Sequence, residues 1–166
     1  MELLIFSDSH GRTDAMRDVI ARQIHRPHAI LFLGDGLRDV DSLEDGQTPW
    51  YAVRGNCDWF GGERPEEIVM ALSGHTLLLT HGHKYAVKSG TGALLAHAAQ
   101  VGADLVLYGH THMPHLQRIE AGEIVSGAPL KRPIYLFNPG SIGGYDASFG
   151  TLTLRENGAL FSHGQL

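Results

Sequence analysis

The chain has 166 residues, of which 43% are hydrophobic and 19% charged, so its composition is that of a globular protein rather than a disordered segment. A formal net charge of −5 argues against nucleic-acid binding through bulk positive charge, and no block of like charges predicts a membrane-binding patch. The longest apolar runs have about five residues, whereas a membrane-spanning helix needs roughly 20, and residues 1–6 lack a signal-peptide pattern.

Short apolar runs alternate with helical patterns in the first part of the chain. Residues 3–6 (LLIF) predict a buried strand, and apolar side chains at helical spacing predict a helix over 14–25. Two further strands are expected at 29–33 (AILFL) and 51–53 (YAV), with a short helix between them. Strands that alternate with helices indicate parallel βαβ units.

The middle of the chain continues this alternation. A strand is expected at 76–80 (TLLLT), after a turn at 73–74. Apolar side chains at helical spacing within 94–101 then predict a helix, which precedes a strand at 104–108 (DLVLY).

The pattern changes in the C-terminal third. Residues 134–137 (IYLF) and the alternating 151–154 (TLTL) predict strands joined by hairpins, and Asn157–Gly158 is a strong two-residue turn signal. The predicted fold class is therefore α/β, a two-sheet sandwich with mixed parallel and antiparallel strands flanked by helices. Because no linker or repeat interrupts the pattern, we expect one domain over 1–166.

Polar side chains follow the predicted strands directly. Ligands of α/β sheets bind beyond the carboxyl ends of the strands, because parallel strands deliver their following loops to one edge. Residues i and i+2 of an extended segment point to the same face, so an Asp-x-His or His-x-His pair can reach one ion together. The side chains in these positions are Asp8, His10, Asp35, Asn56, His81, His110 and His112.

The ligand types indicate a metal centre. Four imidazoles, two carboxylates and one carboxamide suit Mn²⁺, Fe, Zn²⁺, Ni²⁺ or Co²⁺, and the set lacks the thiolates of a structural zinc site. Taken alone, an Asp-x-His pair is as readily a solvated pair, and GD and GN are ordinary turn dipeptides. All of them in this order, each after a strand, favour two ions that share one carboxylate.

These residues resemble the calcineurin-like metallophosphoesterases, whose motifs read D-x-H, G-D, G-N-H-[DE], a single H and G-H-x-H. The resemblance spans Asp8 to His112, and the later NPGS (138–141) resembles the small prokaryotic phosphodiesterase branch. It implies a two-sheet α/β sandwich as the fold. It further implies a first ion held by Asp8, His10, Asp35 and His112, and a second held by Asp35, Asn56, His81 and His110, with Asp35 bridging.

The resemblance also implies a function. It predicts a hydrolase, a di-metal phosphodiesterase in which a metal-activated hydroxide attacks phosphorus, with Mn²⁺ favoured. Asp35, Asn56 and His81 would act catalytically through the metal-bound hydroxide and the phosphate. The alternatives are a phosphomonoesterase and, from another class, a non-catalytic interaction scaffold on the same fold, as in a retromer subunit that has lost ligands.

The expected partner is a small phosphate ester rather than nucleic acid or a membrane, and the sequence leaves a homo-oligomer open. Cys57, the single cysteine, cannot form an internal disulfide, which fits a cytoplasmic location. The same residue departs from the family pattern, because Cys57 stands where many members carry a histidine that contacts phosphate. The spacing of GDGLRD also differs from G-D-x-x-D, so no role is predicted for Asp39.

Several neighbours of the predicted ligands have two interpretations. His83 is either a support for the ligands or a hydrogen-bonded loop residue, and Asp58 either orients a ligand or caps a turn. Arg12 either meets substrate phosphate or belongs to the surface, and the same choice applies to Arg54 and Lys84. Aromatic residues either line a pocket for a base or aryl group or pack in the core; they are Tyr51, Trp59 and Phe60.

Overall fold

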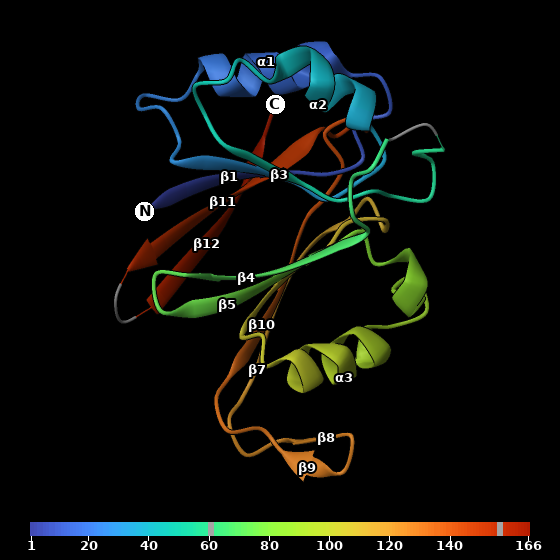
Figure 1. Cartoon of the computed structure of the whole chain (residues 1–166), viewed down its shortest axis with the longest axis vertical. Coiled ribbons are helices and arrows are strands. Elements are labelled where there is room, and N and C mark those ends of the chain that lie inside the picture. Colours follow the sequence, from blue (N-terminus) through green and yellow to red (C-terminus); the bar gives the residue numbers. More distant parts are fainter. Residues whose placement is uncertain (60–61, 156–157) are drawn as a thin grey trace.

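The computed structural model describes residues 1–59, 62–155 and 158–166. Two five-stranded sheets lie face to face (Figure 1). In the first, of order β12-β11-β1-β2-β3, the strands β1 (Glu2–Phe6), β2 (Ala29–Phe32) and β3 (Trp50–Ala52) are parallel. Antiparallel strands β11 (Ser148–Arg155) and β12 (Gly158–Gln165) extend it on the β1 side.

The second sheet has the order β4-β5-β6-β10-β7. Its centre is parallel and contains β5 (His75–Thr80), β6 (Leu105–Leu107) and β10 (Ile134–Pro139). Its edges are antiparallel strands, β4 (Glu67–Leu72) beside β5 and β7 (Pro114–Ile119) beside β10. The sheets confirm the predicted α/β sandwich with mixed pairing.

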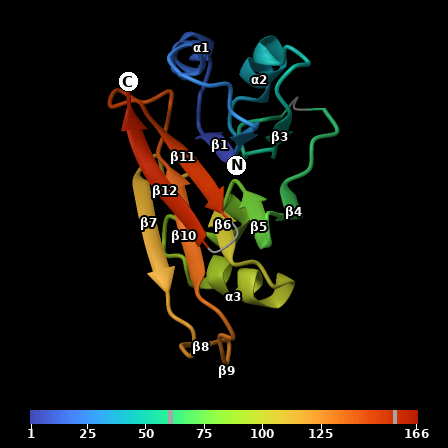
Figure 2. The same cartoon turned by 90° about the vertical axis from the view of Figure 1, so that its left-hand side faces the viewer.

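Helices cover the outer faces of both sheets. In Figure 1, α1 (Thr13–Ala21) and α2 (Leu37–Leu43) lie over the first sheet and α3 (Gly92–Val101) lies under the second. Figure 2, turned by 90°, again places α1 and α2 at one end of the molecule and α3 towards the other. A short 3-10 helix, η1 (His83–Tyr85), follows β5. Among the described residues, no helix is long and apolar enough to cross a membrane.

A small hairpin projects beyond α3. Its strands are β8 (Ile124–Val125) and β9 (Ala128–Pro129), which pair only with each other in an antiparallel register. Figure 1 shows this hairpin at the bottom of the molecule, at the far end from α1 and α2.

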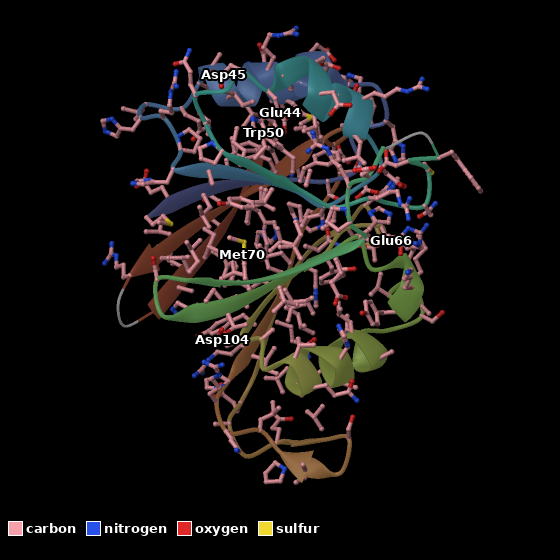
Figure 3. The ribbon with its side chains drawn as sticks, in the orientation of Figure 1. Glu44, Asp45, Trp50, Glu66, Met70 and Asp104 are labelled. Carbon is pink, nitrogen blue, oxygen red and sulfur yellow. The ribbon has the colours of Figure 1, made fainter. Side chains whose placement is uncertain are left out.

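The continuous apolar runs of the central strands follow from burial on both faces. Along β1, Leu3 and Ile5 face the core between the two sheets, whereas Leu4 and Phe6 pack under α1 and α2. Met70 of β4, labelled in Figure 3, packs against the inter-sheet core. A third apolar layer joins α3 to the second sheet.

The first helix is shorter than the helix predicted over 14–25. It ends at Ala21, and the side chain of Ile24 is 93% exposed although its spacing fits the helical pattern. The chain must return to the first sheet, where the His28 N–H already donates to the Glu2 carbonyl (2.9 Å). Pro27 also disfavours a helical conformation at the residue before it. Tertiary pairing therefore overrides the local apolar spacing.

The C-terminal hairpin agrees with the expected pairing. Strands β11 and β12 are antiparallel, with Arg155 opposite Gly158. The turn predicted at Asn157–Gly158 includes 157, which lies outside the described residues.

The topology gathers the loops of interest at one edge. In Figure 1, β1 runs from the N-terminus at the left towards the right-hand side. Beyond the strands, the Asp8 N–H donates to the Gly34 carbonyl (2.9 Å), which joins the loops after β1 and β2. The Gly109 N–H donates to the His81 carbonyl (3.1 Å) and joins the loops after β5 and β6.

Candidate metal centre

Five of the predicted ligands have a left-handed backbone. The φ angles are 54° at Asp8, 46° at His10, 61° at Asp35, 67° at His110 and 61° at His112. Non-glycine residues seldom adopt positive φ, and such strained positions cluster at functional sites. All five lie in the loops that follow β1, β2 and β6.

Asp8, His10 and His112 form the first ligand group. The Nε2 atoms of His10 and His112 lie 3.3 Å apart, and Asp8 Oδ1 lies 3.2 Å from His112 Nε2 and 3.9 Å from His10 Nε2. Two ligand atoms bound to one ion at about 2.0–2.2 Å lie roughly 3.0–3.6 Å from each other. Two of the three separations fall in this range and the third is slightly longer, so the side chains are placed to share one cation.

The second ligand group lies around His81. Its Nε2 atom is 3.3 Å from Asp35 Oδ2, 3.1 Å from Asn56 Oδ1 and 3.2 Å from His110 Nδ1. The other ring nitrogen, Nδ1, donates to the Leu33 carbonyl (2.7 Å). A hydrogen bond of this kind fixes the tautomer and leaves Nε2 as the atom that can bind a metal.

The two groups are adjacent. His81 Nε2 lies 3.9 Å from Asp8 Oδ1, and one ligand atom each of His10, Asp35 and Cys57 lie within 4.8 Å of one another. Asp35 thus lies near members of both groups, and its role as a bridge between two ions stays a prediction. The assignment of each side chain to a particular ion stays a prediction.

Asp8 carries a buried oxygen that fits a cation. Its Oδ2 atom accepts from the Ser7 hydroxyl (2.6 Å) and from the His110 N–H (3.0 Å). Its Oδ1 atom is buried and has no hydrogen-bond partner in the described part of the chain. Burial raises the pKa of Asp8, although the charge of His81 opposes the change. A cation at Oδ1 would compensate the buried charge.

The other side chains of the centre have contrasting charge states. Burial acts to raise the pKa of Asp35, but in the metal-free protein a protonated His81 ring, whose own pKa is raised, and the Cys57 N–H (2.7 Å) outweigh it, so the pKa is lowered. Burial and the neighbouring His81 lower the pKa of His110 to about 4. Near neutral pH, therefore, Asp35 is a carboxylate and His110 a neutral ring, which are the forms that bind metals.

Asp58 holds the loop that carries Asp35. Its carboxylate accepts from the backbone N–H groups of Asp35 (2.8 Å), Gly36 (2.8 Å), Leu37 (3.0 Å) and Gly55 (2.9 Å). It thereby caps the start of α2 and holds the Asp35 backbone, and the prediction that it orients a metal ligand stays a prediction. Gly55 is required here because a Cβ at that position would overlap the Asp35 carboxylate.

Asp58→Ala is expected to weaken metal binding by about 10–100-fold, because four backbone N–H groups lose their acceptor and the Asp35 loop loses its orientation. Titration of the metal-free protein, followed by calorimetry, measures the affinity. Asp45→Ala is the matched control, since Asp45 also accepts two backbone N–H groups but on an exposed turn. Equal affinities in wild type and Asp58→Ala would contradict the positioning role.

Asp39, for which the sequence predicted no role, supports the His10 loop. It is buried, and its carboxylate accepts from the Ser9 hydroxyl (2.6 Å), the Gly11 N–H (2.9 Å) and the Thr13 hydroxyl (2.7 Å). The contacts join α2 to the loop between β1 and α1. No local pattern identifies this role, because its partners lie 26 to 30 residues away.

The NPGS segment joins the first and last ligand loops. The Asn138 side chain donates to the Gly109 carbonyl (2.8 Å) and to the Thr111 hydroxyl (3.1 Å), on either side of His110. The Ser141 hydroxyl donates to the Asp8 carbonyl (2.8 Å). Both side chains are buried, so they act on the centre through the backbone of its loops.

Cys57 and His83 border the centre. Cys57 is exposed and lines a cleft of about 370 Å³ together with His10 and Asp35, and its Sγ accepts from Asn56 Nδ2 (3.3 Å). Burial of the thiol and the charge of Asp35 raise its pKa. The His83 ring lies 5.4 Å from the His81 ring, and its buried Nδ1 has no hydrogen-bond partner among the described residues. Their functional roles stay predictions.

The three basic residues for which the sequence left a phosphate contact open each pair with an acidic side chain. Arg12 Nε pairs with Asp14 (3.2 Å) on the surface. Arg54 pairs with Glu66 (3.3 Å), and Lys84 also pairs with this carboxylate. Glu66 lies at the right-hand side of Figure 3, at the end of the molecule towards which β1 runs.

Comparison with known sequences supports the geometry. Residues 1–157 match the profile of a family described as calcineurin-like phosphoesterase superfamily domain. The phosphodiesterase YfcE of Escherichia coli is 31% identical in an alignment of 180 residues, gaps included, that covers 92% of this chain and 87% of that protein. The probable metallophosphoesterase YsnB of Bacillus subtilis is 29% identical over 142 residues, covering 86% of this chain and 75% of its own.

Solved structures share the fold. A predicted phosphoesterase of Streptococcus pneumoniae superposes with a TM-score of 0.73 and 24% identity, over 99% of this chain and 88% of the other. Vps29 of Entamoeba histolytica in complex with Zn²⁺ has a TM-score of 0.73 and 22% identity, over 99% of both chains. At these identities the likeness concerns the fold alone.

Proposed function

The chain belongs to the calcineurin-like phosphoesterase superfamily, and from this premise we propose that it is a phosphodiesterase that works with two divalent metal ions. Family and relatives make it a metal-dependent phosphoesterase, a hydrolase of phosphoric esters. The observation that carries the finer proposal is the convergence of two ligand groups around Asp35, with the buried Oδ1 of Asp8 left without a hydrogen bond. The preference for diesters draws on the similarity to a protein named a phosphodiesterase.

In this proposal, the side chains around the ions have separate roles. When bound, two divalent ions would polarise the phosphoryl group and lower the pKa of a coordinated water. Asp8 and Asp35 supply the negative charge that such ions need, and His81 is oriented by its hydrogen bond to the Leu33 carbonyl. Asn56 adds a neutral oxygen ligand beside His81. The mixed nitrogen and oxygen set favours Mn²⁺ in our proposal, with Fe, Zn²⁺, Ni²⁺ and Co²⁺ as alternatives.

Two other functions are less well supported. An interaction scaffold rests only on the shared fold of Vps29, and all of the predicted ligand positions are filled here. A phosphomonoesterase would benefit from an acid that protonates a poor leaving group. The thiol of Cys57 is poorly suited to this task, because its raised pKa makes it a weaker acid. The small phosphate-ester substrate belongs to the proposal, and a cytoplasmic location and homo-oligomerisation stay predictions.

Turnover of bis(p-nitrophenyl) phosphate is expected to require metal and to exceed turnover of p-nitrophenyl phosphate. Chelation followed by desalting should reduce the rate to background, and Mn²⁺ should restore it, because the proposed nucleophile forms only on the ions. Release of p-nitrophenolate measures both reactions, with metal content determined in parallel. A monoester rate above the diester rate would contradict the diesterase, and full activity of verified metal-free protein would contradict the metal requirement.

Cys57→His is expected to raise turnover of diesters with poor leaving groups, whereas Cys57→Ala should change little. An imidazole with a pKa near 6.5 can protonate a leaving oxygen near neutrality, a contribution of roughly 10²–10⁴ in rate, and a thiol is poorly matched to that task. The measurement compares kcat/KM for aryl and alkyl diesters at constant metal content. A large loss in Cys57→Ala, with metal content intact, would show that the thiol itself takes part.

A further inference from the structure

Trp59 is an exposed indole at the edge of the metal centre. Its side chain is 85% exposed, so the alternative that it packs in the core is wrong. Tryptophan is highly buried on average, because its large apolar surface is costly to leave in water. An indole at the mouth of a site can bind a ligand, since its flat face can stack on a planar group.

Trp59 is attached to a firmly held part of the chain. It follows Asp58, whose carboxylate binds the backbone N–H groups of Asp35 and Gly55. The Arg54 N–H also donates to the Pro65 carbonyl (2.7 Å), which ties the start of this loop to the segment before β4. The indole therefore stands one residue away from the carboxylate that orients the proposed bridging ligand.

Two clefts meet at Trp59. The first, of about 370 Å³, is lined by His10, Asp35 and Cys57 as well as by Trp59. The second, of about 390 Å³, is lined by Asn56 and His83 and again by Trp59. One cleft borders the first ligand group and the other borders the second. A phosphodiester held between the ions has two ester substituents, and each cleft has room for one of them.

We propose that Trp59 selects the substrate of the proposed phosphodiesterase by stacking on a planar aromatic ring carried by one of the two ester substituents. The substrate class is thus a phosphodiester with an aryl or nucleobase group rather than a purely alkyl diester. This inference rests on the proposed function for its substrate and on the exposure and placement of Trp59 for its selectivity. Trp59 is a specificity residue and takes no part in the chemical step.

Binding of phosphonates tests the inference without turnover, because their C–P bond is not a phosphoester. Calorimetry on the Mn²⁺-loaded protein would compare methylphosphonate, phenylphosphonate and the methylenephosphonate analogue of adenosine 5′-monophosphate. Trp59→Ala is expected to weaken binding of the ring-bearing ligands about tenfold, within the range for loss of one stacked base, and to leave methylphosphonate unchanged. Trp59→Phe keeps an aromatic face and should retain most of the preference.

The matched control is Ile24→Ala, which removes an equally exposed apolar side chain beyond the end of α1. A selective loss of affinity in Trp59→Ala for phenylphosphonate, for the adenosine analogue or for both supports the inference. Which of the two ligands is affected distinguishes an aryl group from a nucleobase. An equal loss of affinity for methylphosphonate, or no loss of affinity for any ligand, overturns the inference. Failure to hydrolyse bis(p-nitrophenyl) phosphate would instead overturn the proposed function, because the binding measurement does not depend on turnover.

Discussion

Asp35→Ala is expected to reduce diester turnover by at least about 10³-fold and to disturb metal binding at both ligand groups. A carboxylate oxygen of Asp35 lies within 4.8 Å of ring nitrogens of His81 and His110 in one cluster and of His10 in another. Removing a shared carboxylate takes one ligand from each ion and leaves the buried His81 without its acidic partner at 3.3 Å. Two-metal catalysis depends on both ions, so the loss in rate should be far larger than for a supporting residue.

The measurement is metal content by elemental analysis after loading and desalting, together with the diesterase rate. Wild type should approach two equivalents of metal per chain, and Asp35→Ala should fall well below this value. Asp18→Ala, which removes an exposed carboxylate of α1 paired with Arg22, is the control and should match wild type. A wild-type stoichiometry of one that Asp35→Ala leaves unchanged would rule out the bridging arrangement.

The candidate centre could be predicted from the sequence because its proposed ligands follow a local rule. Each of them lies in the loop after an apolar strand, and the parallel order of β1, β2 and β3, and of β5 and β6, brings those strand ends to one edge within each sheet. The sandwich itself was predictable from continuous apolar runs followed by an alternating C-terminal third. Shared strand direction places these positions at one edge of each sheet, but the packing of the two sheets is what brings Asp8 and His10 together with His112.

The supporting side chains could not be located in this way. Asp39 contacts the His10 loop from 26 to 30 residues away, and Ser141 contacts Asp8 across 133 residues. Such contacts depend on how α2 and β10 are placed in three dimensions, and neither residue stands in a spacing pattern. The end of α1 was missed for the same reason, since the pairing of His28 with Glu2 competes with the helical spacing of Ile24.

At Asp8, the requirement for metal binding conflicts with the stability of the metal-free protein. The side chain is fully buried, and its Oδ1 atom faces His112 Nε2 at 3.2 Å without a hydrogen bond among the described residues. Burying a carboxylate oxygen without a partner is costly, and a bound cation removes that cost. The arrangement is therefore suited to a metal-loaded protein and unfavourable in the metal-free protein, as expected when a site is selected for binding.

Asp8→Asn is accordingly expected to stabilise the metal-free protein while it removes most of the stabilisation that metal provides. The amide oxygen can keep the donors Ser7 and His110, and the amide N–H can reach the His112 Nε2 atom. Relief of one unsatisfied buried group is worth about 1–2 kcal/mol, or roughly 2–8 °C in Tm for a chain of this size. Thermal unfolding of wild type and Asp8→Asn, each with chelator and with Mn²⁺, gives the four Tm values to be compared.

The control is a buried aspartate whose oxygens are both satisfied. Asp104, labelled in Figure 3, accepts from the Thr76 N–H at Oδ1 (2.7 Å) and contacts His75 Nδ1 at Oδ2 (2.8 Å). Asp104→Asn should lower the Tm, because an amide N–H would replace one of two used acceptors. A metal-free Asp8→Asn protein that is also less stable than wild type would contradict the cost assigned to the buried Oδ1. A variant that gains as much Tm from Mn²⁺ as wild type would show that Asp8 Oδ1 is not a metal ligand.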